Sequence, residues 1–201
     1  MREIIGLSGN PQRPSKTRVL VRESAAAIAV ATGGRSTVFD LVDLAPSLAT
    51  AASLDDLNPA AREIADRLLS ADVLVVGSPV YKASYAGMFK HFFDLLPHDA
   101  LVGKIVCLTA TGGSDRHALV IEQHMRPLFT FFAAFTLPTA IFATPADFDG
   151  DAIRSANIRA RLGMISSEAA TLIGASAMAD IGRTEPRHLR PVPLKAANTG
   201  A

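Results

Sequence analysis

Short apolar runs alternate with longer helical patterns along this chain of 201 residues, and this alternation most narrows the folds open to it. Five apolar runs are predicted to be strands, at residues 3–7, 36–40, 73–77, 104–109 and 139–143. Except for the second, they have the continuous apolar character of strands that are covered on both faces. Helical patterns occupy about residues 16–31, 59–70, 85–96, 115–136 and 151–178. This order predicts βαβ units around a parallel sheet in one α/β domain.

The strand count and the intervening helices indicate a doubly wound, flavodoxin-like sheet of five parallel strands in the order 2-1-3-4-5. In this topology, ligands bind outside the carboxyl ends of the strands at the switch point. We therefore expect the loops after the first, third and fourth strands to converge. Residues 1–180 are expected to form this domain. Residues 181–201 are rich in proline and small residues without periodicity, and they are predicted to be a flexible tail.

The loop after the first strand, residues 8–17, reads Ser-Gly-Asn-Pro-Gln-Arg-Pro-Ser-Lys-Thr. A buried strand that leads through such a loop into a helix points backbone N–H groups and the positive end of the helix dipole at one place. Hydroxyls and a guanidinium can complete a phosphate shell there. Because the loop has neither Walker spacing nor G-x-G-x-x-G, it predicts a site for a phosphomonoester. The alternative is an ordinary loop in which Ser15 or Thr17 caps the helix.

The other two loops carry apolar and glycine-rich segments. Residues 78–87 begin with Ser-Pro-Val-Tyr-Lys, where proline keeps the backbone extended so that its polar groups can pair with a heterocycle. Val80 and Tyr81 offer flat apolar contact. Residues 110–114 read Ala-Thr-Gly-Gly-Ser, and the paired glycines let the backbone approach a ligand closely. Either loop alone is compatible with plain turn chemistry, but three such loops at neighbouring strand ends favour a ligand site.

Composition argues against several classes of protein. The chain has 20 basic and 19 acidic residues, so it lacks the charge excess of proteins that bind nucleic acid or anionic membranes. No apolar segment reaches membrane-spanning length and no signal-type pattern stands at the amino terminus, so we expect a cytoplasmic protein. The one cysteine, Cys107, lies in an apolar run. It is predicted to be a small buried side chain, and no metal site is expected.

Four segments resemble the flavodoxin-like NAD(P)H-dependent FMN reductases, above all the reductase components of two-component alkanesulfonate and methanesulfonate monooxygenases. They are residues 8–17, 78–87, 89–95 (Phe-Lys-His-Phe-Phe-Asp-Leu) and 110–119 (Ala-Thr-Gly-Gly-Ser-Asp-Arg-His-Ala-Leu). The resemblance extends over roughly residues 2 to 180. It implies an enzyme that transfers hydride from NADH or NADPH to FMN and supplies reduced FMN to a partner monooxygenase. It also implies a homotetramer.

The resemblance assigns flavin-binding residues by position. The first loop would hold the FMN phosphate, the second the flavin ring, and the third the pyrimidine side of the ring. The implied residues are Ser8, Asn10, Arg13, Ser15, Lys16 and Thr17 for the phosphate, Pro79, Val80, Tyr81 and Lys82 for the ring, and Thr111, Gly112 and Gly113 for the pyrimidine. Many relatives place an arginine where this chain has Gln12, whereas Arg13 matches the sulfonate subgroup.

Three further expectations concern catalysis and the fourth helical pattern. Hydride transfer between stacked rings needs orientation more than acid–base help, so no catalytic side chain is nominated. His117 is either near the flavin or nicotinamide or a polar residue on a solvent or subunit face, and the second reading is favoured. Some relatives carry a π-bulge in this helix at the subunit interface, with a Tyr or His near the flavin; Gln123 or His124 would occupy that place.

The same helical pattern is apolar on nearly every side over residues 128–135, which predicts burial against another subunit. Its phenylalanines are Phe129, Phe131, Phe132 and Phe135. Pro127 within the pattern predicts a bend or a bulge nearby.

Two other functions fit the same three loops. A quinone or azo reductase would keep FMN bound instead of releasing it. An electron carrier like flavodoxin would need an acidic docking face, which the balanced charge does not favour. The sequence does not separate a preference for NADH from one for NADPH.

Overall fold

The computed structural model of the protein describes residues 1–181, with side chains up to residue 175. Its main sheet has the order β2-β1-β3-β5-β6, and β7 also pairs with β5. The strands of this path are β1 (Glu3–Ser8), β2 (Arg35–Asp40), β3 (Val73–Tyr81), β5 (Ile105–Thr111), β6 (Phe135–Thr136) and β7 (Ile141–Ala143). All of them pair in parallel. This confirms the flavodoxin-like order 2-1-3-4-5, with the fifth strand divided into β6 and β7.

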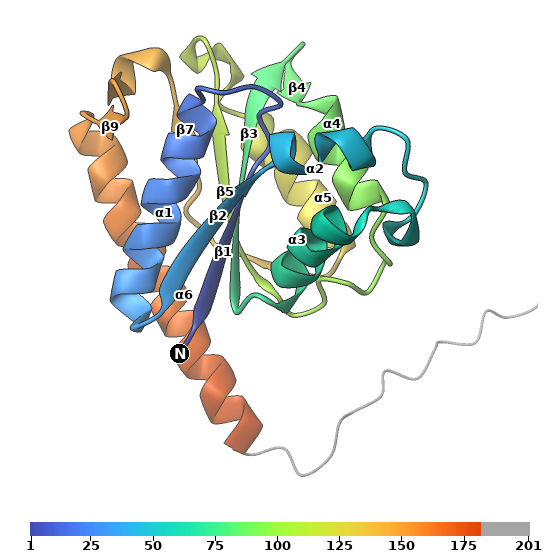
Figure 1. Cartoon of the computed structure of the whole chain (residues 1–201). Coiled ribbons are helices and arrows are strands. Elements are labelled where there is room, and N and C mark those ends of the chain that lie inside the picture. Colours follow the sequence, from blue (N-terminus) through green and yellow to red (C-terminus); the bar gives the residue numbers. More distant parts are fainter. Residues whose placement is uncertain (182–201) are drawn as a thin grey trace, which may run out of the picture.

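Helices cover both faces of the sheet (Figure 1). One face packs against α1 (Lys16–Thr32) and α6 (Ala156–Ile181). The other packs against α2 (Leu41–Leu48), α3 (Pro59–Ser70), α4 (Gly87–Asp94) and α5 (Arg126–Phe131). Each face therefore has its own apolar core, and the central strands β1, β3 and β5 are buried between them. This burial explains why these strands read as continuous apolar runs.

Shorter elements complete the chain. The hairpin strand β4 (Ser84–Tyr85) pairs with the end of β3, and β8 (Phe148–Asp149) pairs with β9 (Ala152–Ile153). The 3-10 turns are η1 (Leu54–Asp56), η2 (Asp115–His117) and η4 (Pro145–Asp147), and η3 (Ile121–Met125) is a π-helix.

Several predicted helix boundaries are wrong. The helix predicted at 115–136 is instead η2, the π-helix η3 and the short α5, which ends at Phe131. Pro127 lies in the first turn of α5, where a missing N–H is tolerated, and the π-helix directly before it is the expected bulge. The helices predicted from residues 85 and 151 begin later, at Gly87 and Ala156, because the strands β4 and β9 come before them. The eight-residue α2 was not predicted, since it is short and contains Pro46.

The phenylalanines of the fourth helical pattern divide into two pairs. Phe129 and Phe132 are buried within the chain itself, against the α4 core. Phe131 is 70% exposed and Phe135 59% exposed. Only the second pair is therefore available to a subunit contact. The tail predicted at 181–201 lies outside the described residues, except for Ile181 at the end of α6.

Candidate functional site

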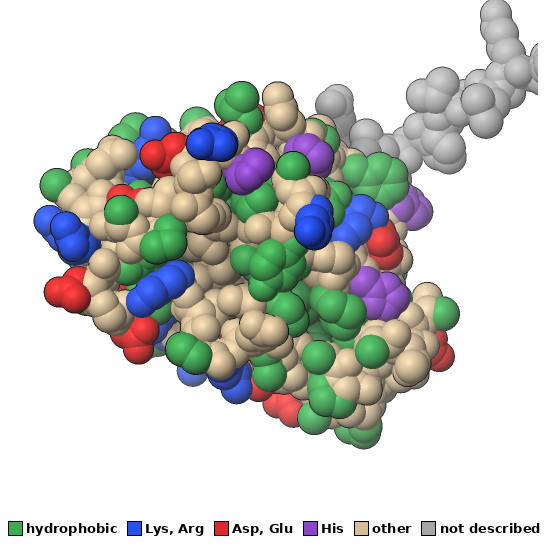
Figure 2. All heavy atoms as spheres, turned by 90° about the horizontal axis from the view of Figure 1, so that it is seen from above, with side chains coloured by type: hydrophobic (Ala, Val, Ile, Leu, Met, Phe, Trp, Pro, Cys, Tyr) green, Lys and Arg blue, Asp and Glu red, His purple; other side chains and the backbone are tan. Residues whose placement is uncertain are grey.

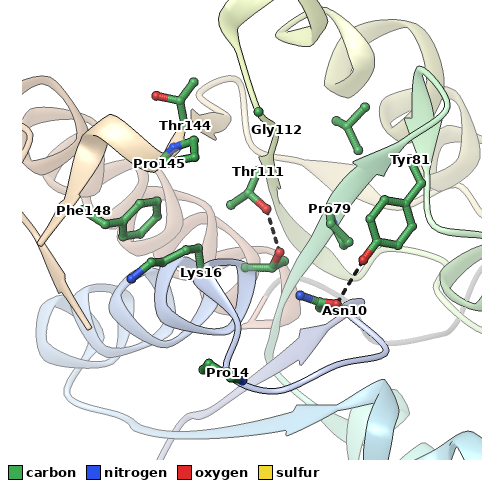
Figure 3. A pocket seen from close by; sticks show the side chains of 13 residues that line it. Asn10, Pro14, Lys16, Pro79, Tyr81, Thr111, Gly112, Thr144, Pro145 and Phe148 are labelled. Atoms are coloured by element: carbon green, nitrogen blue, oxygen red, sulfur yellow. Dashed lines mark hydrogen bonds between the residues drawn. The ribbon is translucent and has the colours of Figure 1, made fainter. Parts of the chain in front are cut away.

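A cleft of about 320 Å³ opens at the edge where β1, β3 and β5 end (Figure 3). This volume lies within the range of small-molecule sites. Its lining residues come from the three predicted loops and from a fourth segment after β7; they are Asn10, Pro14, Lys16, Thr17, Pro79, Val80, Tyr81, Thr111, Gly112, Gly113, Thr144, Pro145 and Phe148. The expected convergence of the loops after the first, third and fourth predicted strands is therefore confirmed.

The loop after β1 is held by hydrogen bonds within itself and to β3. Gly9 N donates to Gly77 O at 2.6 Å, which ties the start of the loop to the neighbouring strand. A Cβ at Gly9 would lie 2.8 Å from that carbonyl oxygen, so glycine is required by close backbone approach. Asn10 Nδ2 donates to Ser15 Oγ at 3.0 Å. Because these bonds fix the loop, the first turn of α1 faces the cleft in a set direction.

Ser15 is the N-cap of α1, and its Oγ accepts from Arg18 N at 3.1 Å. Its side chain does not line the cleft, so the capping alternative holds for this residue. Lys16 and Thr17 do line the cleft. Ser8, at the end of β1, is fully buried, and its Oγ has no hydrogen-bond partner among the described residues.

Two threonine hydroxyls join the first and third loops. Thr17 Oγ1 lies 2.7 Å from Thr111 Oγ1, and both side chains are buried at the floor of the cleft. Figure 3 shows this contact between α1 and the end of β5. The pair fixes the distance between the predicted phosphate end and the glycine loop.

The second loop is a hairpin rather than an open loop. β3 continues beyond the predicted residue 77 to Tyr81, and a turn at Lys82 and Ala83 returns the chain into β4. Both turn residues have left-handed backbone, with φ of 50° and 67°, as a tight hairpin turn requires. The Tyr81 hydroxyl donates to Asn10 Oδ1 at 3.3 Å across the cleft (Figure 3). Lys82 stands at the exposed tip and does not line the cleft.

The third loop is held in place by contacts with β7. Gly112 N donates to Ala143 O at 3.0 Å, and a Cβ at Gly112 would lie 2.7 Å from the Phe142 ring. A side chain at 112 would therefore require the Phe142 ring of β7 to shift. At Gly113 a Cβ would meet nothing within 4 Å.

The fourth segment was missed by the sequence analysis. Thr144 and Asp147 form a capping box around η4, with Asp147 Oδ2 accepting from Thr144 N at 2.8 Å. This Thr-x-x-Asp pattern directly after the fifth predicted strand is the signal that would have located it. Lys16 Nζ donates to Gly150 O and lies 5.6 Å from the centre of the Phe148 ring. The segment is thus attached to α1 through a side chain that itself lines the cleft.

Arg13 does not line the cleft. Its Nε donates to Asp40 Oδ2 at 2.7 Å, and its Nη2 lies 2.8 Å from Asp43 Oδ2. Arg18 Nη1 reaches the same Asp40 oxygen at 2.6 Å. The hydrogen bond to Asp40 raises the pKa of Arg13, so its guanidinium stays charged. The structure thus places Arg13 against the amino end of α2, away from the cleft.

Within residues 1–181, no histidine lines the cleft. His117 is exposed in η2. Gln123 and His124 are both in the π-helix. Of the two, His124 contacts the hairpin, since its Nδ1 lies 3.0 Å from Ser84 Oγ and its ring meets Tyr85 edge-on at 6.2 Å.

Cys107 lies in the middle of β5 and is fully buried. Burial raises the pKa of its thiol to about 12. The prediction of a small buried side chain is confirmed.

The cleft fits a flat heterocycle that carries a phosphate. The amino end of α1, Lys16 and the hydroxyl of Thr17 suit the anion, and Val80 with Tyr81 supplies the flat apolar wall. Ser8, which was expected to contact the phosphate, does not line the cleft.

Comparisons with known proteins agree with this description. A family profile described as NADPH-dependent FMN reductase matches residues 2–149. The chain is 40% identical over 172 residues to the FMN reductase (NADPH) of Pseudomonas aeruginosa, covering 86% of this chain and 92% of the relative. It is 41% identical, over the same shares, to the NADH-dependent FMN reductase SfnF of Pseudomonas fluorescens.

Solved structures of other proteins share the fold of this chain. The X-ray structure of an oxidoreductase from Corynebacterium diphtheriae has a TM-score of 0.79 at 35% identity, covering 87% of this chain and 98% of that one. A flavodoxin, WrbA-like protein from Agrobacterium tumefaciens has a TM-score of 0.58 at 15% identity, covering 87% and 99%, and so shares the fold.

The fold and the cleft therefore define a flavodoxin-like flavoprotein. Within that class the chain belongs to the NADPH-dependent FMN reductase family, and it is an oxidoreductase that uses NAD(P)H and FMN. Among the described residues, no helix combines the length and apolarity needed to cross a membrane.

Proposed function

We propose that the protein reduces FMN with NADH or NADPH and releases the reduced flavin to a partner monooxygenase that acts on organosulfur compounds. The observation that supports the proposal is that the amino end of α1, where an anion is favoured, and the flat apolar side chains of Val80 and Tyr81 line one cleft. Among the described residues, Lys16 is the one charged side chain that lines it. The resemblance of residues 8–17, 78–87, 89–95 and 110–119 to sulfonate-type reductase components supports the choice of partner.

Bound FMN supplies the hydride-accepting ring, and the protein supplies orientation. The amino end of α1, with Asn10, Lys16 and Thr17, would hold the phosphate. Pro79 and Val80 would present backbone polar groups to the ring edge, and Tyr81 would limit access of water to its face. No proton donor is required from the side chains that line the cleft.

Steady-state oxidation of NADH and of NADPH tests the proposal, with FMN, FAD, riboflavin or a quinone as acceptor. FMN should give the highest kcat/KM. Gel filtration after anaerobic reduction should separate the flavin from the protein. Flavin that stays bound while a quinone is reduced rapidly would favour the alternative of an FMN-retaining quinone or azo reductase.

The electron-carrier alternative is less well supported. Figure 2 views the molecule from above Figure 1, onto the edge where the strands end, and acidic and basic side chains are interspersed there. A carrier that docks by charge would present one sign of charge around its flavin.

The partner is tested by coupling. A flavin-dependent sulfonate monooxygenase, supplied with this protein, FMN and NAD(P)H, should release sulfite from an alkanesulfonate. A photoreduced FMN supply without the protein is the control. Sulfite release with photoreduced FMN but not with this protein would exclude the monooxygenase as its partner.

We also propose that the protein works as a homo-oligomer, a tetramer by its resemblance to the reductase components. Phe131 and Phe135 are exposed, and a cavity of about 470 Å³ lies beside Phe131 between α4 and α5. Phe131→Glu should place a charge in the contact, lower the mass measured by light scattering and reduce FMN-dependent NAD(P)H oxidation. Val30→Glu, on the exposed side of α1, is the matched control. An unchanged mass in Phe131→Glu would contradict the assignment of this surface.

A further inference from the structure

Four charged side chains form a cluster behind the phosphate loop. They are Arg13, Arg18, Asp40 and Asp43. Asp40 is 1% exposed and ends β2 next to Ser8 of β1. Its Oδ2 accepts from both arginines, at 2.7 Å from Arg13 Nε and 2.6 Å from Arg18 Nη1. A buried carboxylate of this kind requires a cation beside it.

The two arginines do not depend on the cluster equally. Arg13 belongs to the loop whose next residue, Pro14, lines the cleft, and its side chain is 46% exposed. If Arg13 turned toward the cleft, Arg18 would still pair with Asp40, so the buried carboxylate would not be left alone. Asp43 is the partner that would lose its cation, and it is 37% exposed, so water would solvate it. Arg13 is therefore the exchangeable member of the cluster.

We propose that Asp43 competes with the FMN phosphate for the guanidinium of Arg13, and so sets how easily this protein exchanges flavin. A phosphate dianion and a carboxylate offer the same bidentate geometry to an arginine. In the described structure the carboxylates hold Arg13. Binding of FMN would draw Arg13 from Asp43 to the phosphate. The free energy needed to break the Arg13–Asp43 pair would then be subtracted from the affinity for FMN. Asp43 is thus a positioning residue that acts through Arg13.

Lys16, the charged residue that lines the cleft, is also bound to an acceptor of the protein. Its Nζ donates to the backbone oxygen of Gly150. Both cations next to the phosphate end are therefore bound to acceptors of the protein. An uncharged carbonyl is the weaker competitor, so Asp43 is expected to have the larger effect on affinity.

The inference rests on the proposed function in taking FMN as the exchanging ligand. The test is titration of apo-protein with FMN and with riboflavin, followed by flavin fluorescence. Asp43→Asn keeps an amide oxygen for the bond from Asp40 N and removes the competing charge. We expect FMN to bind about twofold to fivefold more tightly, the range for an exposed ion pair, and riboflavin to bind unchanged.

A double-mutant cycle separates competition from a general loss of negative charge. In an Arg13→Ala background, Asp43→Asn should no longer favour FMN over riboflavin. Asp66→Asn, which breaks a comparable pair with Arg62 on α3, is the control and should leave the ratio unchanged. The inference would be overturned if Asp43→Asn left the ratio of FMN to riboflavin affinity unchanged. It would also be overturned if the gain in FMN affinity persisted in the Arg13→Ala background.

These outcomes are independent of the release assay. A wild-type protein that retains FMN through turnover would remove the proposed function without altering the ratio of affinities. An unaltered ratio in a protein that releases FMN would remove the competition alone. Thermal melting of each variant shows whether it is folded before titration.

Discussion

The two walls of the cleft are held by different kinds of contact. The strand-end wall, made of Asn10, Thr17, residues 79–81 and residues 111–113, follows buried strands and is fixed by hydrogen bonds within the sheet edge. The second wall is made of Thr144, Pro145 and Phe148, and we call it the hairpin wall after the β8–β9 hairpin, which is separate from the β3–β4 hairpin. It is attached to α1 by Lys16 and by Arg22, whose Nη2 donates to Asp151 O at 2.9 Å. We infer that the first wall sets the geometry of the site, and that the second adjusts its affinity for the phosphate.

The largest effect is expected at Gly9. Gly9→Ala forces a Cβ to within 2.8 Å of Gly77 O, so the strand-end wall must shift. We expect a loss of about 1–3 kcal/mol in the free energy of unfolding and a more than tenfold weaker FMN complex. Urea unfolding and FMN titration measure the two. Gly163→Ala, at an exposed position of α6 where a Cβ meets nothing within 4 Å, is the control. Equal behaviour of the two variants would show that this wall is not rigid.

The Thr17–Thr111 pair comes next. Thr17→Val leaves the buried Thr111 hydroxyl without its partner, which should cost about 1–3 kcal/mol in the free energy of unfolding. The double variant Thr17→Val/Thr111→Val removes both polar groups and should recover most of that loss. Urea unfolding of the three variants gives the coupling energy. Additive losses would mean that the two hydroxyls do not stabilise the floor of the cleft as a pair.

A smaller effect is expected at Lys16, where the walls meet. Lys16→Met should lower the preference for FMN over riboflavin roughly tenfold, because one charged contact to the phosphate is lost. Arg22→Met breaks the other attachment of the hairpin wall without reaching the cleft, so it should leave the preference unchanged. Fluorescence titration of both variants with both flavins decides it. A similar loss in both would mean that Lys16 acts only by holding the hairpin.

The smallest effect is expected at Cys107, within the strand that carries the third loop. Its pKa of about 12 means that almost no thiolate is present near neutral pH, and the thiolate is the reactive form. A thiol reagent should label the native protein slowly and leave NAD(P)H oxidation intact, whereas the unfolded protein should react at once. Rapid native labelling would show that the sheet under the cleft opens.

Sequence reasoning located the strand-end wall because its residues follow strands of unmistakable apolar character. Asn10, Thr17 and Tyr81 were placed by that argument and by resemblance together, and all three line the cleft. The hairpin wall was missed, since Thr144 and Pro145 lie where a short strand gives way to turns with no periodicity.

Two further assignments depended on information that a linear pattern does not contain. Arg13 has the residue type expected of a phosphate ligand, but Asp40 and Asp43, which hold it elsewhere, lie about 30 residues further along the chain. The fourth helical pattern was read as one helix because a single π-turn adds only one residue to an otherwise α-helical pattern. Side-chain partners distant in sequence, and single-residue changes in helical winding, are the features that required coordinates.

The amino end of α1 is connected to several parts of the site. Ser15 caps the helix, Thr17 contacts the third loop and Arg18 the carboxylate cluster. Lys16 and Arg22 both donate to the turn between β8 and β9. Fraying of this one helix end would therefore release all of them at once. Its backbone amides should exchange with deuterium as a single cooperative unit. Flavin should slow that exchange along the whole helix end, including positions that never touch the ligand.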